Sequence, residues 1–180
     1  YYLITGKDLP ILPVAVIISF LFIAGVWALM GTVIKRWFPE TPFTVYMLLC
    51  TLIGIGCGTW DRLMMPNLHE IPIWTAMALG VWGLYFWIGS VRSDSVSLWR
   101  MGLGSFLLAL ISGCRPQLLL LLFLAGPVFW EPVKEGRLLR DKKAQELLCF
   151  GLPILAVAIG IMYYNFIRFG SVTDFGSRYN

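Results

Sequence analysis

The residue with the most distinctive chemical setting is Arg115, which stands next to Pro116 in the middle of the apolar stretch 101–130. An arginine at the centre of a membrane helix costs at least ~2.5 kcal/mol, and it usually faces a partner or a water-filled cavity. A guanidinium can hold a phosphate or a carboxylate through two parallel hydrogen bonds. We therefore predict that Arg115 binds substrate. The alternative is that it extends to the membrane surface or pairs with a structural acid.

A second polar group lies at the end of the last apolar segment. Asn165 and Arg168 are three residues apart, so a helix places them on one face, and Asp174 follows where the helix ends near Gly170. We predict substrate binding by Asn165 and Arg168, and we consider Asp174 as a catalytic acid. An arginine and an aspartate at a membrane surface also form structural ion pairs worth ~1 kcal/mol or less, so both roles stay open.

The third group lies in the loop that separates two apolar segments near residues 61–70. Asp61 and Glu70 are candidates for a catalytic carboxylate, although Glu70 also suits a capping role at a helix start. His69 could bind substrate or transfer a proton. A metal site needs clustered ligands, and a single histidine near two methionines does not provide them. We predict neither a metal nor another cofactor.

Composition predicts the elements that position these residues. Of the 180 residues, 58% are hydrophobic and 13% are charged, against roughly 25% charged in soluble domains. The apolar residues fall in blocks of about 20, the length that crosses a ~30 Å hydrocarbon core. We predict an all-α polytopic membrane domain with full spans at 11–34, 43–60, 71–88 and 147–169. A soluble enzyme, a disulfide scaffold and a nucleic-acid-binding domain are excluded, and the lipid bilayer is the expected partner.

The stretch 101–130 differs from the other apolar blocks because Gly113-Cys114-Arg115-Pro116 interrupts it. It is too long for one straight crossing and too short for two. Two half-helices of about 13 residues, each near 20 Å long, fit better. We predict a re-entrant or broken helical hairpin at 101–130, followed by a basic cytoplasmic loop at 131–146.

The basic residues predict the orientation. With the turn at Lys35-Arg36 and the loops 92–100 and 131–146 inside, nine of the 14 Lys and Arg residues are cytoplasmic, as the positive-inside rule favours. This count requires the hairpin to enter and leave from the same side. The candidate residues then share the outer face of the bacterial cytoplasmic membrane. The net charge of +4 reports topology and requires no nucleic-acid partner.

Small and aromatic residues are assigned to packing and to the membrane interface. Gly54, Gly56 and Gly58 are interpreted as helix-packing residues. Four aromatic residues at the end of the third span are interpreted as an interfacial belt; they are Trp82, Tyr85, Phe86 and Trp87. Residues 1–5 are interpreted as the last turn of an upstream helix, so the chain is expected to be part of a longer protein.

Several blocks of the sequence resemble polytopic bacterial glycosyltransferases with the C-type (GT-C) fold. The segment ISGCRPQ at 111–117, followed by a leucine run, resembles their Arg-Pro break. The segment YYNFIRFGS at 163–171, with DFG at 174–176, resembles the YNY-x-RFGS…FG signature of a large group of mostly uncharacterised bacterial multi-spanning proteins. The loop MPNLHE at 65–70 is similar to a proline- and acid-containing segment in the same group.

The resemblance implies an integral membrane enzyme that transfers a sugar from a polyprenyl-phosphate donor to an acceptor outside the cytoplasm. In the GT-C fold the catalytic acid usually lies in the first large external loop, and no residue of this chain matches it. The resemblance makes Arg115, Asn165 and Arg168 candidates to hold the donor phosphate or to shape the cavity. An arginine can stabilise the charge that develops on a lipid-phosphate leaving group.

Two other functions fit the same residues. A transporter or flippase of lipid-linked saccharides needs the same arginine and broken helices without any chemistry. A non-catalytic scaffold subunit of an envelope complex needs neither. An essential external carboxylate would separate a transferase from a transporter, and tolerance of Arg115→Ala would indicate a scaffold.

Overall fold

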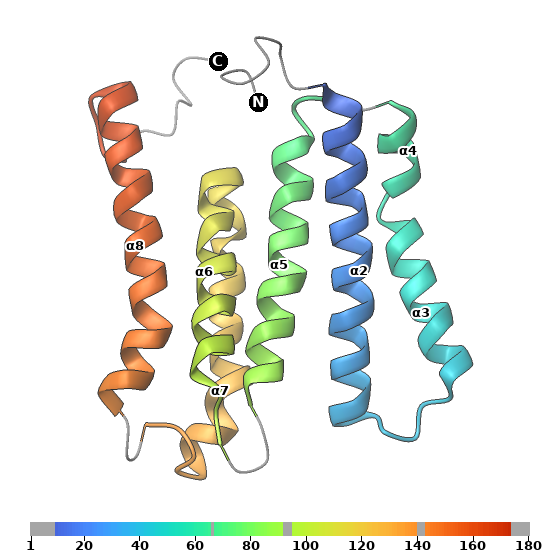
Figure 1. Cartoon of the computed structure of the whole chain (residues 1–180), viewed down its shortest axis with the longest axis vertical. Coiled ribbons are helices and arrows are strands. Elements are labelled where there is room, and N and C mark those ends of the chain that lie inside the picture. The colour runs from blue at the N-terminus through green and yellow to red at the C-terminus, as the bar shows by residue number, and fades with distance from the viewer. Residues whose placement is uncertain (1–9, 66, 92–94, 140–142, 174–180) are drawn as a thin grey trace. The chain divides into compact units, whose positions relative to one another are not determined.

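The computed structural model describes residues 10–65, 67–91, 95–139 and 143–173. Apart from an isolated bridge between Val91 and Val96, the regular structure in these ranges is helical, as predicted. The chain divides into two compact units, residues 1–85 and 86–180, and the boundary falls within α5. The elements, coloured along the chain in Figure 1, are α2 (Ile11–Trp37), α3 (Phe43–Gly56), α4 (Thr59–Met64), α5 (Ile71–Ser90), α6 (Leu98–Cys114), the 3-10 helix η1 (Pro116–Leu124), α7 (Ala125–Lys134) and α8 (Lys143–Phe169).

Four helical segments of the described chain are long and apolar enough to cross a membrane: α2, α5, η1 together with α7, and α8. Only 6% of the most apolar window of α8 is buried, and exposed apolar surfaces of that size are rare in water-soluble proteins. Lipid is the solvent that such a surface requires. The fold therefore agrees with the prediction of a helical, multi-pass membrane protein.

The second predicted span, 43–60, is wrong in its extent because the helix is interrupted. α3 ends at Gly56, and Gly58 adopts a φ of 77°, a left-handed conformation that glycine tolerates. The hydroxyl of Thr59 donates a 2.6 Å hydrogen bond to the carbonyl of Gly54. This bond satisfies one of the carbonyl groups that a helix end leaves without an intrahelical partner. The short helix α4 begins directly after this break, at Thr59.

The three glycines near this break have different roles. A Cβ at Gly54 would lie 3.8 Å from the side chain of Ile23 in α2, whereas a Cβ at Gly56 would meet nothing within 4 Å. Gly58 forms the break itself. The interpretation of all three as helix-packing residues therefore holds only for Gly54.

Unit 1 is built around the contact between α2 and the first half of α5. Its core consists of Phe22, Val26, Trp74 and Ala78, and the rings of Phe22 and Trp74 meet edge to face with centroids 5.3 Å apart. A Cβ at Gly25 would lie 2.6 Å from the side chain of Val81, so glycine is required for this close approach. The turn with Lys35 and Arg36 lies at the opposite end of α2 from the loop that precedes α5 (Figure 1).

Unit 2 contains α6, η1, α7, α8 and the last turn of α5. α6 and α8 run in the same direction: a Cβ at Gly102 would lie 3.2 Å from the carbonyl oxygen of Cys149, and one at Gly113 would lie 3.7 Å from Ile161. The two contact points are therefore about eleven residues apart on α6 and about as far apart on α8, and they follow one another in the same order on both helices.

The aromatic residue Trp87 is a core residue of unit 2 and not part of an interfacial belt. Its side chain is 0% exposed, and its ring stacks on Phe150 at a centroid distance of 5.5 Å. Phe129 of α7 contacts the same ring at 5.5 Å. The prediction is wrong for this residue because α7 and α8 cover the last turn of α5, which the sequence of α5 alone does not reveal.

The predicted break at residue 115 is present, and the chain doubles back there. α6 ends at Cys114, Arg115 is extended with a φ of −149° and a ψ of 98°, and η1 begins at Pro116. An extended residue before proline follows from the steric clash of the proline ring with the preceding residue. The start of α6 and the end of α7 then lie together, since Met101 and Val133 line one groove.

The two arms of the hairpin are longer than predicted. α6 has 17 residues, η1 has 9 and α7 has 10, so α6 is ~25 Å long and η1 with α7 is ~33 Å long. The predicted loop 131–146 is correspondingly too long, because α7 continues to Lys134 and α8 begins at Lys143. The second arm alone is as long as the hydrocarbon core of a bilayer.

Candidate functional site

Arg115 occupies the turn of the hairpin between α6 and η1. Its backbone N–H donates a 2.8 Å hydrogen bond to Ile111, and its carbonyl oxygen accepts one of 3.0 Å from Leu118. Its side chain is half-buried. Within the described part of the chain, no hydrogen bond or ion pair engages the guanidinium. Because a partly buried guanidinium retains five donors that need acceptors, this side chain can hold an anionic group.

Asn165 and Arg168 differ in burial although they are three residues apart. Asn165 is 3% exposed, and its amide nitrogen donates a long 3.5 Å hydrogen bond to the carbonyl of Val172. Arg168 is exposed; its guanidinium donates a 2.6 Å hydrogen bond to the hydroxyl of Tyr164 and lies 5.2 Å from the ring centre of Phe169. Asn165 therefore ties the end of α8 to the following segment, and Arg168 packs on the surface of α8. Asp174 lies outside the described residues.

Glu70 is the best placed of the acidic candidates. It is half-buried and borders a cavity of about 20 Å³ together with Ser19, Asn67 and Trp74, a volume that holds about one water molecule. Its backbone carbonyl accepts a 3.1 Å hydrogen bond from the N–H of Trp74. Glu70 thus stands at the start of α5, where an acidic residue is also favourable for the helix dipole.

His69 and Asp61 are surface residues. The side chain of His69 is exposed, while its backbone N–H donates a 3.1 Å hydrogen bond to the side-chain oxygen of Asn67. Asp61 is exposed on α4, and its backbone carbonyl accepts a 2.9 Å hydrogen bond from Met65. Neither contact prepares the side chain for catalysis.

The candidates are divided between the two units. Asp61, His69 and Glu70 belong to unit 1, whereas Arg115, Asn165 and Arg168 belong to unit 2. Of the candidates in unit 1, Glu70 borders a cavity. Of the described candidates in unit 2, Arg115 is the one whose side chain has no hydrogen-bond acceptor among the described residues. In the same ranges no group of three His, Cys, Asp or Glu residues could hold a metal ion.

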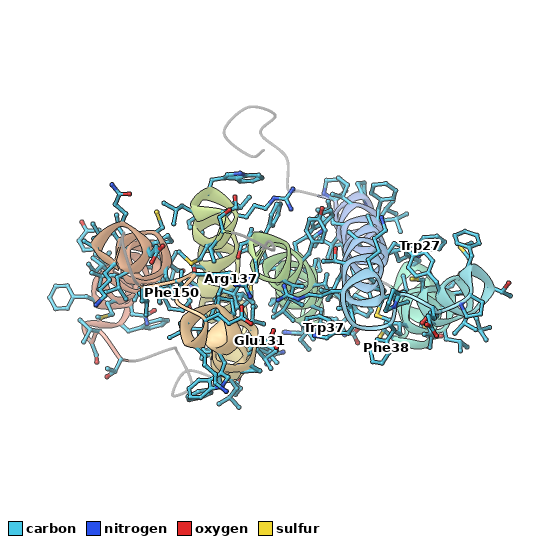
Figure 2. All side chains as sticks on the ribbon, turned by 90° about the horizontal axis from the view of Figure 1, so that it is seen from below. Trp27, Trp37, Phe38, Glu131, Arg137 and Phe150 are labelled. Atoms are coloured by element: carbon cyan, nitrogen blue, oxygen red, sulfur yellow. The ribbon has the colours of Figure 1, made fainter. Side chains whose placement is uncertain are left out.

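The structure reveals a further feature that sequence analysis missed, an apolar groove between α7 and the start of α8. Its volume is about 320 Å³, and Glu146 is the one charged side chain among its lining residues. The apolar walls include Phe129, Trp130, Val133, Leu138, Leu147 and Phe150. Figure 2 labels Arg137 and Phe150 beside these two helices. The sequence feature that could have indicated this groove is the apolar pair at 138–139 within the otherwise polar segment.

Comparison of the chain with models of protein families, with curated proteins and with solved structures finds no match in any of the three.

Proposed function

We propose that this chain is part of a GT-C-like glycosyltransferase of the bacterial cytoplasmic membrane, which transfers a sugar from a polyprenyl-phosphate donor to an envelope acceptor on the outer face. The observation that carries the proposal is Arg115, a half-buried guanidinium at a helix break with no acceptor in the described part of the chain. An arginine within an apolar hairpin is costly. A lipid phosphate is an acceptor that would offset this cost.

The chemistry follows from the charge that develops during transfer. When the sugar leaves the donor, negative charge accumulates on the lipid phosphate, and a preorganised guanidinium stabilises it in a medium of low dielectric constant. A carboxylate removes the proton of the acceptor hydroxyl. Glu70, Asp61 and Asp174 are the acids of this chain that the proposal assigns to the outer face.

The proposed topology requires the hairpin to enter and leave from the cytoplasmic side. Two features support it: the start of α6 lies beside the end of α7, and the segment between α7 and α8 is basic. Single cysteines at positions 67, 115, 136 and 171 in a cysteine-free background test this arrangement. An impermeant thiol reagent added outside the cell should label positions 67 and 171 and leave position 136 unlabelled. Labelling at position 136 would overturn the topology.

A transfer assay tests the activity. Membranes with the full protein receive undecaprenyl phosphate carrying a radiolabelled hexose, and release of the label from the lipid is measured. Arg115→Ala should lower the rate by about 100-fold, the effect of removing one transition-state donor, and Arg115→Lys should recover part of it. Gln117→Ala, an exposed neighbour, is the control. Wild-type rates in Arg115→Ala would contradict the proposal.

A transporter of lipid-linked saccharides is the second candidate. The antiparallel pair of α6 and η1, joined at an extended residue, resembles the discontinuous helices that line substrate sites in transporters. The 3-10 conformation of η1 extends over 9 residues, longer than usual for this conformation and typical of hinges when it interrupts a helix. If Asp61→Asn, Glu70→Gln and Asp174→Asn together leave activity intact while Arg115→Ala abolishes it, the transporter is favoured.

A further inference from the structure

We propose that the groove between α7 and α8 binds one acyl chain of an anionic phospholipid from the surrounding bilayer, with the lipid phosphate held by Lys134 and Lys143. This site is independent of the proposed transfer activity, because it lies at the end of the hairpin opposite to Arg115. It uses residues that no candidate role above involves.

The walls of the groove fit a hydrocarbon chain. Phe129, Val133 and Phe150 face it from α7 and α8, and its volume of about 320 Å³ falls in the range of small-molecule sites, ~300–1,000 Å³. The neighbouring side chain Trp130 is 70% exposed. An exposed tryptophan at such a position is typical of the interface between hydrocarbon and headgroups.

Two lysines flank the groove. Lys134 follows the wall residue Val133 and is the exposed last residue of α7, and Lys143 is the exposed first residue of α8, one turn before the wall residue Glu146. Lys143 also stands at the helix end where the dipole is already positive, which is unfavourable for a cation. A bound phosphate would offset this unfavourable interaction, because a helix N-terminus attracts anions.

The acidic residue in the wall sets the orientation of the lipid. Glu146 is 8% exposed, and its Oε2 accepts the backbone N–H of Leu139. Its negative charge keeps a phosphate away from the inner part of the groove, so the acyl chain enters and the headgroup remains at the two lysines. Arg137, which lies between the helices in sequence, is already paired with Glu135 at 2.5 Å.

The charges beside the groove favour an anionic phospholipid over a protein segment or a zwitterionic lipid. The segment 131–146 carries five basic and four acidic residues, and Arg137 is paired with Glu135. The exposed Lys134 and Lys143 flank the apolar walls, where cations attract anionic lipids of the cytoplasmic leaflet. A protein segment would need polar partners for its backbone, and the walls of the groove provide almost none. A zwitterionic lipid would gain the apolar contacts without the charge preference.

The experiment measures lipid retention by the purified full protein. Native mass spectrometry compares phosphatidylglycerol with phosphatidylcholine of the same chain length. The wild-type protein should retain phosphatidylglycerol preferentially. Gly126→Leu should lose most of the retained lipid, because Gly126 lines the groove and a Cβ there meets nothing within 4 Å, so the added side chain can occupy the groove. Gly160→Leu is the matched control, since Gly160 is equally open and lies on α8 away from the groove.

The lysines are tested separately from the walls. Lys134→Gln and Lys143→Gln should each lower the preference for phosphatidylglycerol by about fivefold, with Lys35→Gln in unit 1 as the control. Inorganic phosphate at millimolar concentration should not displace the lipid. Equal retention of both lipids, wild-type retention in Gly126→Leu, or displacement by phosphate alone would overturn the proposal. Preferential retention of undecaprenyl phosphate over phosphatidylglycerol would also overturn it.

Discussion

The carboxylate of Glu146 holds the turn that follows α7, because its Oε2 accepts a 2.5 Å hydrogen bond from the backbone N–H of Leu139. Leu139 has a φ of 62°, a conformation that non-glycine residues seldom adopt. On the other side of the turn, the N–H groups of Arg137 and Leu138 donate to the carbonyl of Pro132. One side chain of α8 thus stabilises the segment that closes one wall of the groove.

Removing the acceptor at Glu146 should loosen this turn. Glu146→Leu leaves the N–H of Leu139 without its charged acceptor, which costs ~1.5–3 kcal/mol. Glu146→Gln retains an oxygen and should cost less than half as much. Thermal unfolding of the purified protein in detergent and the rate of tryptic cleavage after Arg137 measure the effect. Gln145→Leu, at the exposed neighbour, is the control, and equal stability of both Glu146 variants would contradict the role of this bond.

The left-handed backbone conformation of Leu139 leads to a second prediction. Leu139→Gly removes the steric cost of a positive φ, roughly 1–2 kcal/mol, and this gain offsets the loss of a half-buried side chain. The midpoint of thermal unfolding should therefore stay the same or rise. Leu138→Gly is the comparison, because Leu138 is 7% exposed and its removal should lower stability by at least ~2 kcal/mol. A large loss in Leu139→Gly would show that its side chain outweighs its backbone strain.

The close approach of α6 and α8 depends on Gly102. Gly102→Ala places a methyl group 3.2 Å from the carbonyl oxygen of Cys149, and a backbone atom cannot yield as a flexible side chain does. The backbone of α8 must shift by a few tenths of an ångström to accept the methyl group, at a cost of ~1–3 kcal/mol. Gly160→Ala adds the same group where nothing lies within 4 Å and should not lower stability. If both variants unfold at the same temperature, the contact is not rigid.

The buried hydrogen bond between Trp87 and Ser105 should couple α5 to α6. The indole N–H donates to the serine hydroxyl at 3.1 Å, and both side chains are 0% exposed. Ser105→Ala leaves this donor without its acceptor, at a cost of ~1–3 kcal/mol. In Trp87→Phe the donor is absent, so adding Ser105→Ala to that background should cost less. Strictly additive losses in this double-mutant cycle would contradict the coupling.

Properties that depend on neighbouring residues along the chain are predictable from the amino-acid sequence alone. Apolar blocks of spanning length predict membrane helices wherever they occur, and the Arg115-Pro116 pair predicts a helix break because proline restricts its own backbone and that of the preceding residue. The presence of these elements and the position of the break were therefore predictable. Their exact ends were not, as the extension of α7 to Lys134 shows.

Which side chains contact one another depends on how distant segments pack. Trp87 is a core residue because Phe150, far away in the sequence, stacks on it, and periodicity within α5 carries no information about α8. The three-residue spacing of Asn165 and Arg168 predicts that both lie on one face of the helix. The carbonyl of Val172 nevertheless accepts a hydrogen bond from Asn165 and not from Arg168. The groove with Glu146 at its wall arises from the packing of α7 beside the starts of α6 and α8. Burial and partnership depend on contacts between distant segments, and those contacts exist only after the helices have packed.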